Sequence, residues 1–158
     1  MKNIFKIIIG AAILIVVDQL SKYFFYTNSS EVIEVVKNFF TLQYTENTGV
    51  AFSIPIPSQI TVLISLTLII VVAYLSKIHM KLEKSLSIII LALFFSGALG
   101  NVIDRIFKGF VIDFISIWKW PVFNLADTYI VIAVLLFIVF YDKIMEVKNK
   151  KNDRTTGK

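Results

Sequence analysis

Four long runs of apolar residues divide the chain, near residues 4–26, 58–76, 86–106 and 124–142. Each run approaches the roughly 20 residues that a helix needs to cross a bilayer. Helices are the expected form, because lipid offers no hydrogen-bonding partner to an exposed backbone group. The pattern therefore predicts an all-α membrane protein, a bundle of four transmembrane helices that forms a single domain over residues 1–158.

The segment between the first two runs has a different pattern. Residues 31–53 (EVIEVVKNFFTLQYTENTGVAFS) are rich in β-branched and aromatic residues, and apolar and polar positions partly alternate. Such alternation is typical of a strand with one solvated face. We expect a small extramembrane β-sheet from residues 31–53, with a turn near residues 46–49 (ENTG).

Composition agrees with a membrane location and excludes several kinds of chemistry. Hydrophobic residues make up 57% of the chain, against roughly 45–50% in soluble domains, and the mean hydropathy is +0.79. The absence of cysteine excludes a disulfide, a thiolate nucleophile and a cysteine metal site. The only histidine, His79, lies in a charged run, and neither a zinc-protease motif nor a phosphate-binding loop occurs. We therefore expect no metal and no cofactor.

Lysine and arginine set the expected orientation. Of the 16 such residues, most lie in the N-terminus, the loop at 76–85 and the C-terminal tail. Both termini are therefore expected to be cytoplasmic, and the first apolar run is expected to be an uncleaved span because it lacks a small-x-small cleavage site. The basic tail at 146–158 is expected to be a disordered inner anchor rather than a nucleic-acid-binding element.

Ionisable residues gather near the expected outer ends of the spans, where burying them is costly. Asp18 and Lys22 are four residues apart and share one helical face, so they form either a neutralising pair that fixes helix packing or a pair with a direct role. In the third span, Asn101 and Arg105 project from the outer end, and Arg105 could hold a carboxylate or a backbone carbonyl. Asp104 could be the counter-charge of Arg105.

Asp127 begins the fourth run, three residues after Asn124. In the simpler interpretation, Asn124 caps a helix and Asp127 complements the N–H groups of its first turn. The alternative is a reactive pair, since two partly desolvated carboxylates resist ionising together, and one stays protonated while the other activates water. Spacing permits either Asp104–Asp127 or Asp113–Asp127, and the lack of an obvious basic partner for Asp113 mildly favours the second.

Five segments in this order resemble the lipoprotein signal peptidases (signal peptidase II): DQLSK, ENTGVAF, GALGNVIDR, VIDFI and FNLAD. The resemblance implies an aspartic endopeptidase of the bacterial plasma membrane, with its active site at the outer face, that cleaves prolipoprotein signal peptides immediately before a diacylglyceryl-modified cysteine. It implies that Asp113 and Asp127 are the catalytic acids. The other matching positions would bind substrate or support the site: Asn47, Gly49, Asn101, Asp104, Arg105, Asn124, Asp18 and Lys22.

The resemblance also sets the expected partners. The substrate would be a diacylglyceryl-modified prolipoprotein, membrane lipid would surround a monomer, and no nucleic acid would bind. Two positions depart from the family, Glu46 and Val50, and their departure concerns the contacts of that loop rather than the chemistry. The rival class is a small transporter with Asp18, Asp113 and Asp127 as ion sites, which the absence of an evident internal repeat disfavours.

Overall fold

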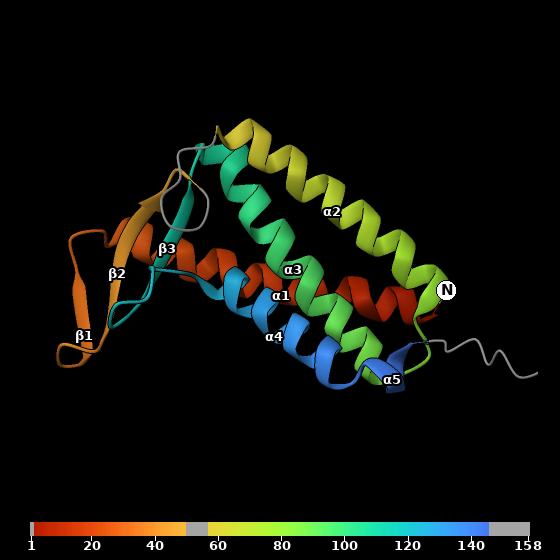
Figure 1. Ribbon diagram of the computed structural model, residues 1–158. Coiled ribbons are helices and arrows are strands. Elements are labelled where there is room, and N and C mark those ends of the chain that lie inside the picture. The colour runs from red at the N-terminus through yellow and green to blue at the C-terminus, as the bar shows by residue number, and fades with distance from the viewer. Residues whose placement is uncertain (1, 50–56, 146–158) are drawn as a thin grey trace, which may run out of the picture.

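The computed structural model describes residues 2–49 and 57–145. Five helices and three strands follow one another in these ranges (Figure 1): α1 (Lys2–Thr27), β1 (Val32–Val36), β2 (Phe40–Asn47), α2 (Ser58–His79), α3 (Ser85–Lys108), β3 (Val111–Ile117), α4 (Leu125–Val139) and α5 (Tyr141–Ile144). The expected tail at 146–158 and the end of the expected sheet lie outside these residues.

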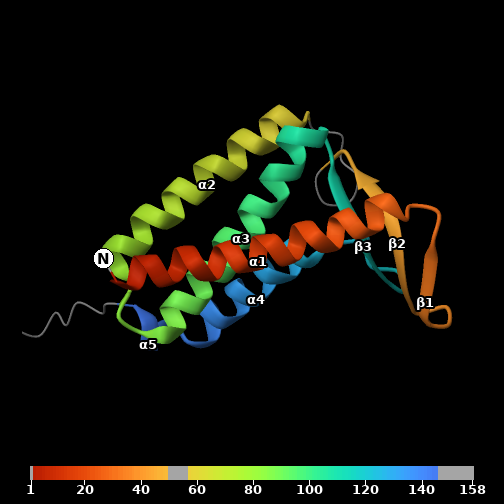
Figure 2. The same cartoon turned by 180° about the vertical axis from the view of Figure 1, so that it is seen from behind.

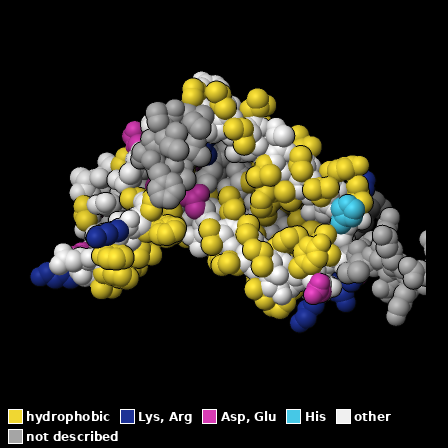
Figure 3. All heavy atoms as spheres, viewed as in Figure 1, with side chains coloured by type: hydrophobic (Ala, Val, Ile, Leu, Met, Phe, Trp, Pro, Cys, Tyr) yellow, Lys and Arg dark blue, Asp and Glu magenta, His cyan; other side chains and the backbone are white. Residues whose placement is uncertain are grey.

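Helix α3 holds the helical part together. It packs against α1, α2 and α4. It is also the most buried of the three longest helices: 56% of the residues in its most apolar segment are buried inside the protein, against 17% in α1 and 6% in α2. Most apolar side chains of α1 and α2 are not covered by protein, and hydrophobic side chains are spread over the helical part of the face seen in Figure 3. Helices that are apolar all round but little buried by protein are what a lipid environment requires.

Three of the expected spans are confirmed as helices long and apolar enough to cross a membrane, namely α1, α2 and α3. The fourth run does form an apolar helix, but α4 has only 15 residues and ends at Val139. The rest of the expected segment 124–142 leaves the helix at Phe140 and begins the short α5. That α4 also crosses the membrane stays a prediction.

A small β-sheet is confirmed, with strands that differ in part from the expected ones, and its place outside the membrane stays a prediction. It has three antiparallel strands in the order β1-β2-β3, so its third strand comes from the connection between the last two long apolar runs. Strand β2 ends at Asn47 and a bend follows at Gly49, so the chain does turn near residues 46–49, although this is not the turn that joins β1 to β2. The hairpin turns instead at residues 37–39, where Asn38 has a φ of 56°, which asparagine tolerates better than most residues.

The two ends of the molecule differ in character. The sheet and the start of α4 lie at one end, and the start of α1, the α2–α3 connection and α5 lie at the other (Figures 1 and 2). At the second end, the N–H of Lys81 donates to the carbonyl of Ile144 at 2.7 Å, which ties the α2–α3 connection to α5. The lysines of residues 76–85 are therefore gathered at the same end as the N-terminus.

Glycine allows α3 to approach its neighbours closely near the sheet end. A Cβ at Gly97 would overlap the carbonyl oxygen of Ala126 in α4 and would lie 2.7 Å from Ile130 Cγ1. A Cβ at Gly100 would lie 2.7 Å from Asp18 Oδ2 of α1. Small residues of this kind let helices pack backbone to backbone within a membrane.

Gly97→Ala is expected to destabilise the protein by about 1–3 kcal/mol, because the added methyl group must push α4 away from α3. Gly10→Ala is the matched control, since a Cβ there meets only the Cβ of Ala92 at 3.2 Å. Thermal melting of the two purified variants in detergent measures the difference. A Gly97 variant that melts with the wild type would contradict direct backbone packing of these helices.

Candidate active site

A buried ion cluster joins α1 to α3. The Lys22 ammonium lies 2.8 Å from Asp18 Oδ2 and 2.9 Å from Asp104 Oδ2, and all three side chains have 0% exposure. It also donates to Asn101 Oδ1 at 3.0 Å. An ammonium has three donors, so Lys22 has one acceptor for each. Of the two interpretations of Asp18 and Lys22, the ion pair that fixes packing is present.

Asp104 has partners other than the expected one. Its oxygens accept from Lys22 and from Lys108, whose Nζ lies 2.8 Å from Asp104 Oδ1. Asp104 thus forms its ion pairs with these lysines and not with Arg105, although its charge also acts on Arg105. The reason is that adjacent helical residues point about 100° apart whereas residues four apart share a face. Arg105 instead donates through Nη2 to the carbonyl of Gly49 at 3.3 Å, which was one of the two partners expected for it.

Asp18 extends the cluster to α4. Its Oδ1 accepts from the N–H of Ala126 at 2.9 Å, in the first turn of α4. Gln19, a residue that the sequence analysis did not single out, donates to Asp18 Oδ2 at 3.1 Å and to the carbonyl of Gly100 at 3.2 Å. Three helices therefore meet at one buried carboxylate.

The start of α4 has the cap that the sequence predicts. Asn124 Oδ1 accepts from the N–H of Asp127 at 2.9 Å, and Asp127 Oδ2 accepts from the N–H of Asn124 at 3.3 Å, which is a reciprocal capping box. The carboxylate of Asp127 is thereby held against the N-terminus of the helix, where the helix dipole favours negative charge. The capping interpretation is confirmed, and it does not exclude a second role.

Strand β3 brings Asp113 to the same place. Phe123, which precedes the cap, exchanges backbone hydrogen bonds with Ile115 at 2.8 and 3.0 Å. This pairing lays the chain before α4 alongside β3, so Asn124 lies next to Asp113. On the other side, Thr45 of β2 is the register partner of Asp113, and Asn47 is its diagonal neighbour on the same face of the sheet.

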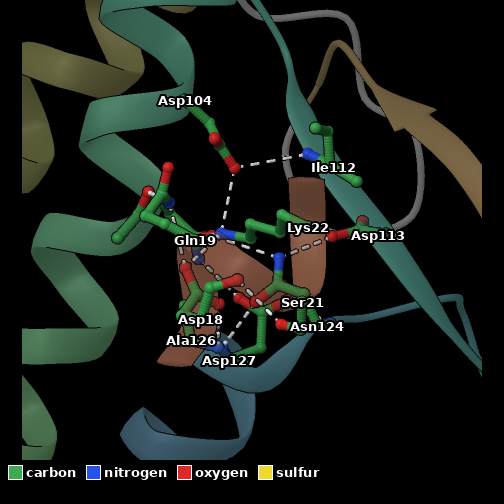
Figure 4. A network of polar contacts seen from close by, with 12 residues as sticks. Asp18, Gln19, Ser21, Lys22, Asp104, Ile112, Asp113, Asn124, Ala126 and Asp127 are labelled. Carbon is green, nitrogen blue, oxygen red and sulfur yellow. Dashed lines mark hydrogen bonds and ion pairs between the residues drawn. The ribbon is translucent and has the colours of Figure 1, made fainter. Parts of the chain in front are cut away.

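Two amide side chains connect the carboxylates of Asp113 and Asp127, and one of them, Asn124, is labelled near both acids in Figure 4. Asn124 Nδ2 donates to Asp113 Oδ1 at 2.7 Å and to Asn101 Oδ1 at 3.1 Å. Asn101 Nδ2 donates to Asp127 Oδ1 at 2.8 Å. Asn47 Nδ2 completes the set by donating to Asp113 Oδ2 at 2.9 Å. The structure thus brings the two acids into one hydrogen-bonded network from two different elements.

The loop after β2 is attached to this network at its edge. Asn47 Oδ1 accepts from the N–H of Gly49 at 3.1 Å, and the carbonyl of Gly49 accepts from Arg105. The side chain of Asn47 therefore contacts both Asp113 and the loop. All the site residues expected from the sequence lie in this one region of contacts.

The environment of Asp113 disfavours its charged form. Its side chain is buried at 2% exposure, and this burial, together with the nearby charge of Asp127, raises the pKa of Asp113 to about 6. The amides of Asn47 and Asn124 and the charge of Lys22 oppose the shift without cancelling it. The residue is therefore suited to hold a proton at a pH where an ordinary aspartate has lost it.

Other candidate groups lie elsewhere. His79 lines an apolar cavity of about 300 Å³ between α2, α3 and α4, at the end away from the carboxylates. Within residues 2–49 and 57–145, no group of three or more His, Asp or Glu side chains is placed to hold a metal ion. Lys108 was missed by the sequence analysis, although its spacing of four from Asp104 is the signal that finds such pairs. Gln19 gave no comparable signal.

Comparison with known proteins gives a consistent result. A family model described as signal peptidase (SPase) II matches residues 10–142. A lipoprotein signal peptidase of Moorella thermoacetica is 38% identical over 129 residues, which are 80% of this chain and 85% of that protein. One of Chlorobium phaeobacteroides is 34% identical over 148 residues, covering 84% of this chain and 93% of that protein.

Solved structures agree in fold. A bacterial membrane enzyme determined by the in meso method at 2.3 Å resolution is 29% identical, with a TM-score of 0.73 over 92% of both chains. A second, determined at 1.9 Å, has a TM-score of 0.71 and 28% identity, over 85% of this chain and 91% of the other. The match of the family model over most of the chain and the similarity to these relatives lead to one conclusion: the chain belongs to the signal peptidase II family, a family of peptidases.

Proposed function

We propose that this chain is an aspartic endopeptidase that removes signal peptides from prolipoproteins, with Asp113 and Asp127 as its catalytic acids. The observation that carries the proposal is the convergence of these two carboxylates, one from β3 and one from α4, on Asn124, whose side-chain Nδ2 donates to Asp113 and whose backbone N–H donates to Asp127. The relatives named lipoprotein signal peptidase support the substrate class. The bond cut would be the one immediately before a diacylglyceryl-modified cysteine.

The charges of the site favour a single proton shared by the pair. Four carboxylates and three cations make up the buried region and its border: Asp18, Asp104, Asp113, Asp127, Lys22, Lys108 and Arg105. With every group ionised, one negative charge remains uncompensated, and burying such a charge is costly. One proton held between Asp113 and Asp127 removes it, which is the protonation state that acid–base hydrolysis by two carboxyl groups requires.

The proposed reaction needs only water and the two acids. The charged carboxylate takes a proton from water, and the water oxygen attacks the carbonyl carbon of the scissile peptide bond. The protonated carboxyl donates its proton to the carbonyl oxygen. Collapse of the tetrahedral intermediate breaks the C–N bond: the carboxyl that took the proton from water gives it to the leaving amine, and the other carboxylate takes a proton from a hydroxyl of the intermediate, which leaves a carboxylic acid and returns one proton to the pair. The roles of the two acids thus alternate over one cycle.

The position of the site suits a substrate that is itself a membrane helix. Asp113 belongs to β3 and Asp127 to the start of α4, and these elements lie at the end of the molecule opposite the α2–α3 connection (Figure 1). With lysine-rich segments inside, both termini are cytoplasmic and the site is at the outer face of the plasma membrane. A signal peptide would then present its cleavage point at the same level. We propose four spans and a monomer surrounded by lipid.

Asp113→Asn and Asp127→Asn are each expected to lower cleavage of a diacylglyceryl-modified prolipoprotein by about 10³-fold or more, because each removes one proton-transfer group. Asp104→Asn should keep partial activity and melt at a lower temperature, since it removes a partner of Lys22. Asp142→Asn, an exposed acid at the other end, is the control.

The measurement is cleavage by detergent-purified protein, with melting curves to show that each variant is folded. Full activity of Asp113→Asn would exclude this pair of acids. A wild-type protein without activity on a substrate of proven lipidation would count against the peptidase function itself.

The raised pKa of Asp113 predicts a pH effect on stability. The folded protein keeps this proton up to about pH 6, whereas an unfolded aspartate loses it near 3.8. Between these values the folded state binds more protons, so the free energy of unfolding falls as pH rises. Asp113→Asn removes the effect. Between about pH 4 and pH 7 the free energy of unfolding should fall by up to roughly 3 kcal/mol less in the variant than in the wild type. Melting temperatures measured across this pH range show the difference. An equal fall would contradict the raised pKa.

The orientation is open to a labelling test because the chain contains no cysteine. Lys37→Cys in the hairpin turn should react with a membrane-impermeant maleimide on intact bacterial cells. Lys84→Cys, in the α2–α3 connection, should react only after the cells are lysed. Labelling in the opposite order would overturn the proposed topology without bearing on the chemistry.

A further inference from the structure

Lys22 carries a positive charge on a side chain with 0% exposure, and its ammonium contacts Asp18, Asp104 and Asn101 but neither of the two proposed catalytic acids. We infer that Lys22 is a positioning residue for the carboxylate pair, because its ammonium, together with Nδ2 of Asn124, holds the side-chain amide of Asn101 in the orientation that donates a hydrogen bond to Asp127. This inference rests on the proposed function, which assigns the chemistry to Asp113 and Asp127. It adds a role for a residue of α1, which contributes neither acid.

An asparagine amide has an acceptor end and a donor end of nearly equal shape, so its neighbours decide which way it points. The ammonium of Lys22 offers only donors, and it lies 3.0 Å from Oδ1 of Asn101. Nδ2 of Asn101 is thereby directed to Oδ1 of Asp127, at 2.8 Å. Reversal would place an NH₂ group against an ammonium and a carbonyl oxygen against a carboxylate, and both contacts are repulsive.

The ammonium itself cannot turn away from Asn101. Its two remaining donors are held by Asp18 and Asp104 at 2.8 and 2.9 Å. Asp18 is fixed in turn by the backbone N–H of Ala126, and Asp104 by Lys108. The contact between Lys22 and Asn101 therefore has the rigidity of three helices behind it, which a positioning role requires.

The second amide of the site is held differently. Asn124 presents its Oδ1 to the N–H of Asp127 and so would keep its orientation without Lys22. Loss of Lys22 would leave Asn101 Oδ1 with the donor from Asn124 Nδ2 at 3.1 Å only, so it should weaken the hydrogen bond to Asp127 while leaving the donors to Asp113 in place. The charged form of the pair is then less stabilised, and the acid limb of the pH profile of kcat/KM should move to higher pH.

Several other ionisable groups surround this network, and each can affect its titration. From the elements packed around it, the described groups are Asp18 in α1, Asp104, Arg105 and Lys108 in α3, Asp113 in β3, and Tyr129 in α4. A variant that only removes a positive charge would therefore mix two effects. The test needs one variant that keeps the net charge and another that removes a cation without touching Asn101.

The charge-balanced variant is Lys22→Met with Asp104→Asn, which removes one positive and one negative charge from the same contact. We expect kcat to fall by about 10–100-fold, in the range typical of groups that orient a reacting residue, with KM changed by less than about 2-fold and the acid limb moved to higher pH. Asp104→Asn alone, as background, should leave the limb unmoved. Lys22→Arg in the otherwise wild-type chain should keep most of the wild-type rate, because a guanidinium also offers only donors.

Lys108→Met is the matched control. It removes the other cation on Asp104, but the Lys108 side chain is 30% exposed and water screens its charge, so the variant should lower the melting temperature without moving the pH profile. A double-mutant cycle gives the decisive comparison: if Lys22 acts through Asn101, then adding Asn101→Ala to the charge-balanced variant should cause little further loss. Additive losses, or an unmoved pH profile in a folded variant, would overturn the inference.

A readout that does not depend on cleavage separates this inference from the proposed function. The infrared band of protonated carboxyl groups can be followed against pH in the wild type, the charge-balanced variant and Lys108→Met. The pH at which the band disappears should differ from the wild-type value only in the charge-balanced variant. That shift would support the positioning role even if the protein cut no lipidated substrate. The absence of a shift, together with normal wild-type cleavage, would overturn the positioning role alone.

Discussion

The structure depends on the way in which one buried positive charge is neutralised. Taking an ammonium and two carboxylates out of water costs several kcal/mol per ion, and only close contacts with satisfied donors offset this. Lys22 meets that condition with Asp18, Asp104 and Asn101 at 2.8–3.0 Å. Because these partners belong to α1 and α3, and Asp18 also binds the first turn of α4, the same contacts that neutralise the charge fix the three helices relative to one another.

The proposed site follows from this arrangement. Once α1, α3 and α4 are fixed, the start of α4 lies against Asn101, and the capping box sets Asp127 in a single position. The backbone pairing of Phe123 with Ile115 brings β3, and with it Asp113, to the side-chain amide of Asn124. Asn124 thus serves the helix and the acid pair at once. A substitution of Asn124 would therefore disturb folding and chemistry together. A substitution of Asp113, which caps no helix, separates the effect on chemistry from the effect on folding more clearly.

The sequence predicted the parts of this site that depend on local spacing. Asn124 and Asp127 are three residues apart at a helix start, and Asp18 and Lys22 are four apart within a helix, so their contacts follow from helical geometry. Asp113 was chosen over Asp104 only mildly from the residues, and more firmly from the resemblance to the family. The structure adds that Asn124 donates to both acids, through Nδ2 to Asp113 and through its backbone N–H to Asp127. Their catalytic roles are a proposal.

The remaining features depend on pairing between distant segments. Strand β3 was not foreseen, because a short run such as VIDFISI is apolar on both sides and carries no alternation that distinguishes it from buried helix. The hairpin turn at residues 37–39 lacks glycine and proline, so Asn38 was overlooked in favour of the glycine at position 49. The register that sets Asn47 diagonal to Asp113 comes from contacts 66 residues apart, which no local pattern contains.

The length of α4 bears on how a membrane-bound substrate meets the two acids. Its 15 residues give a helix of about 22 Å, whereas the hydrocarbon core of a bilayer is about 30 Å thick. In the proposed four-span arrangement, α5 lies at the inner end, so the start of α4 and Asp127 would lie below the outer boundary of the hydrocarbon. Water at that depth is scarce, which makes hydrogen-bonded amides the main stabilisers of any charge on the pair. For this reason the donor that Asn101 directs at Asp127 would act beside burial in setting when the pair ionises.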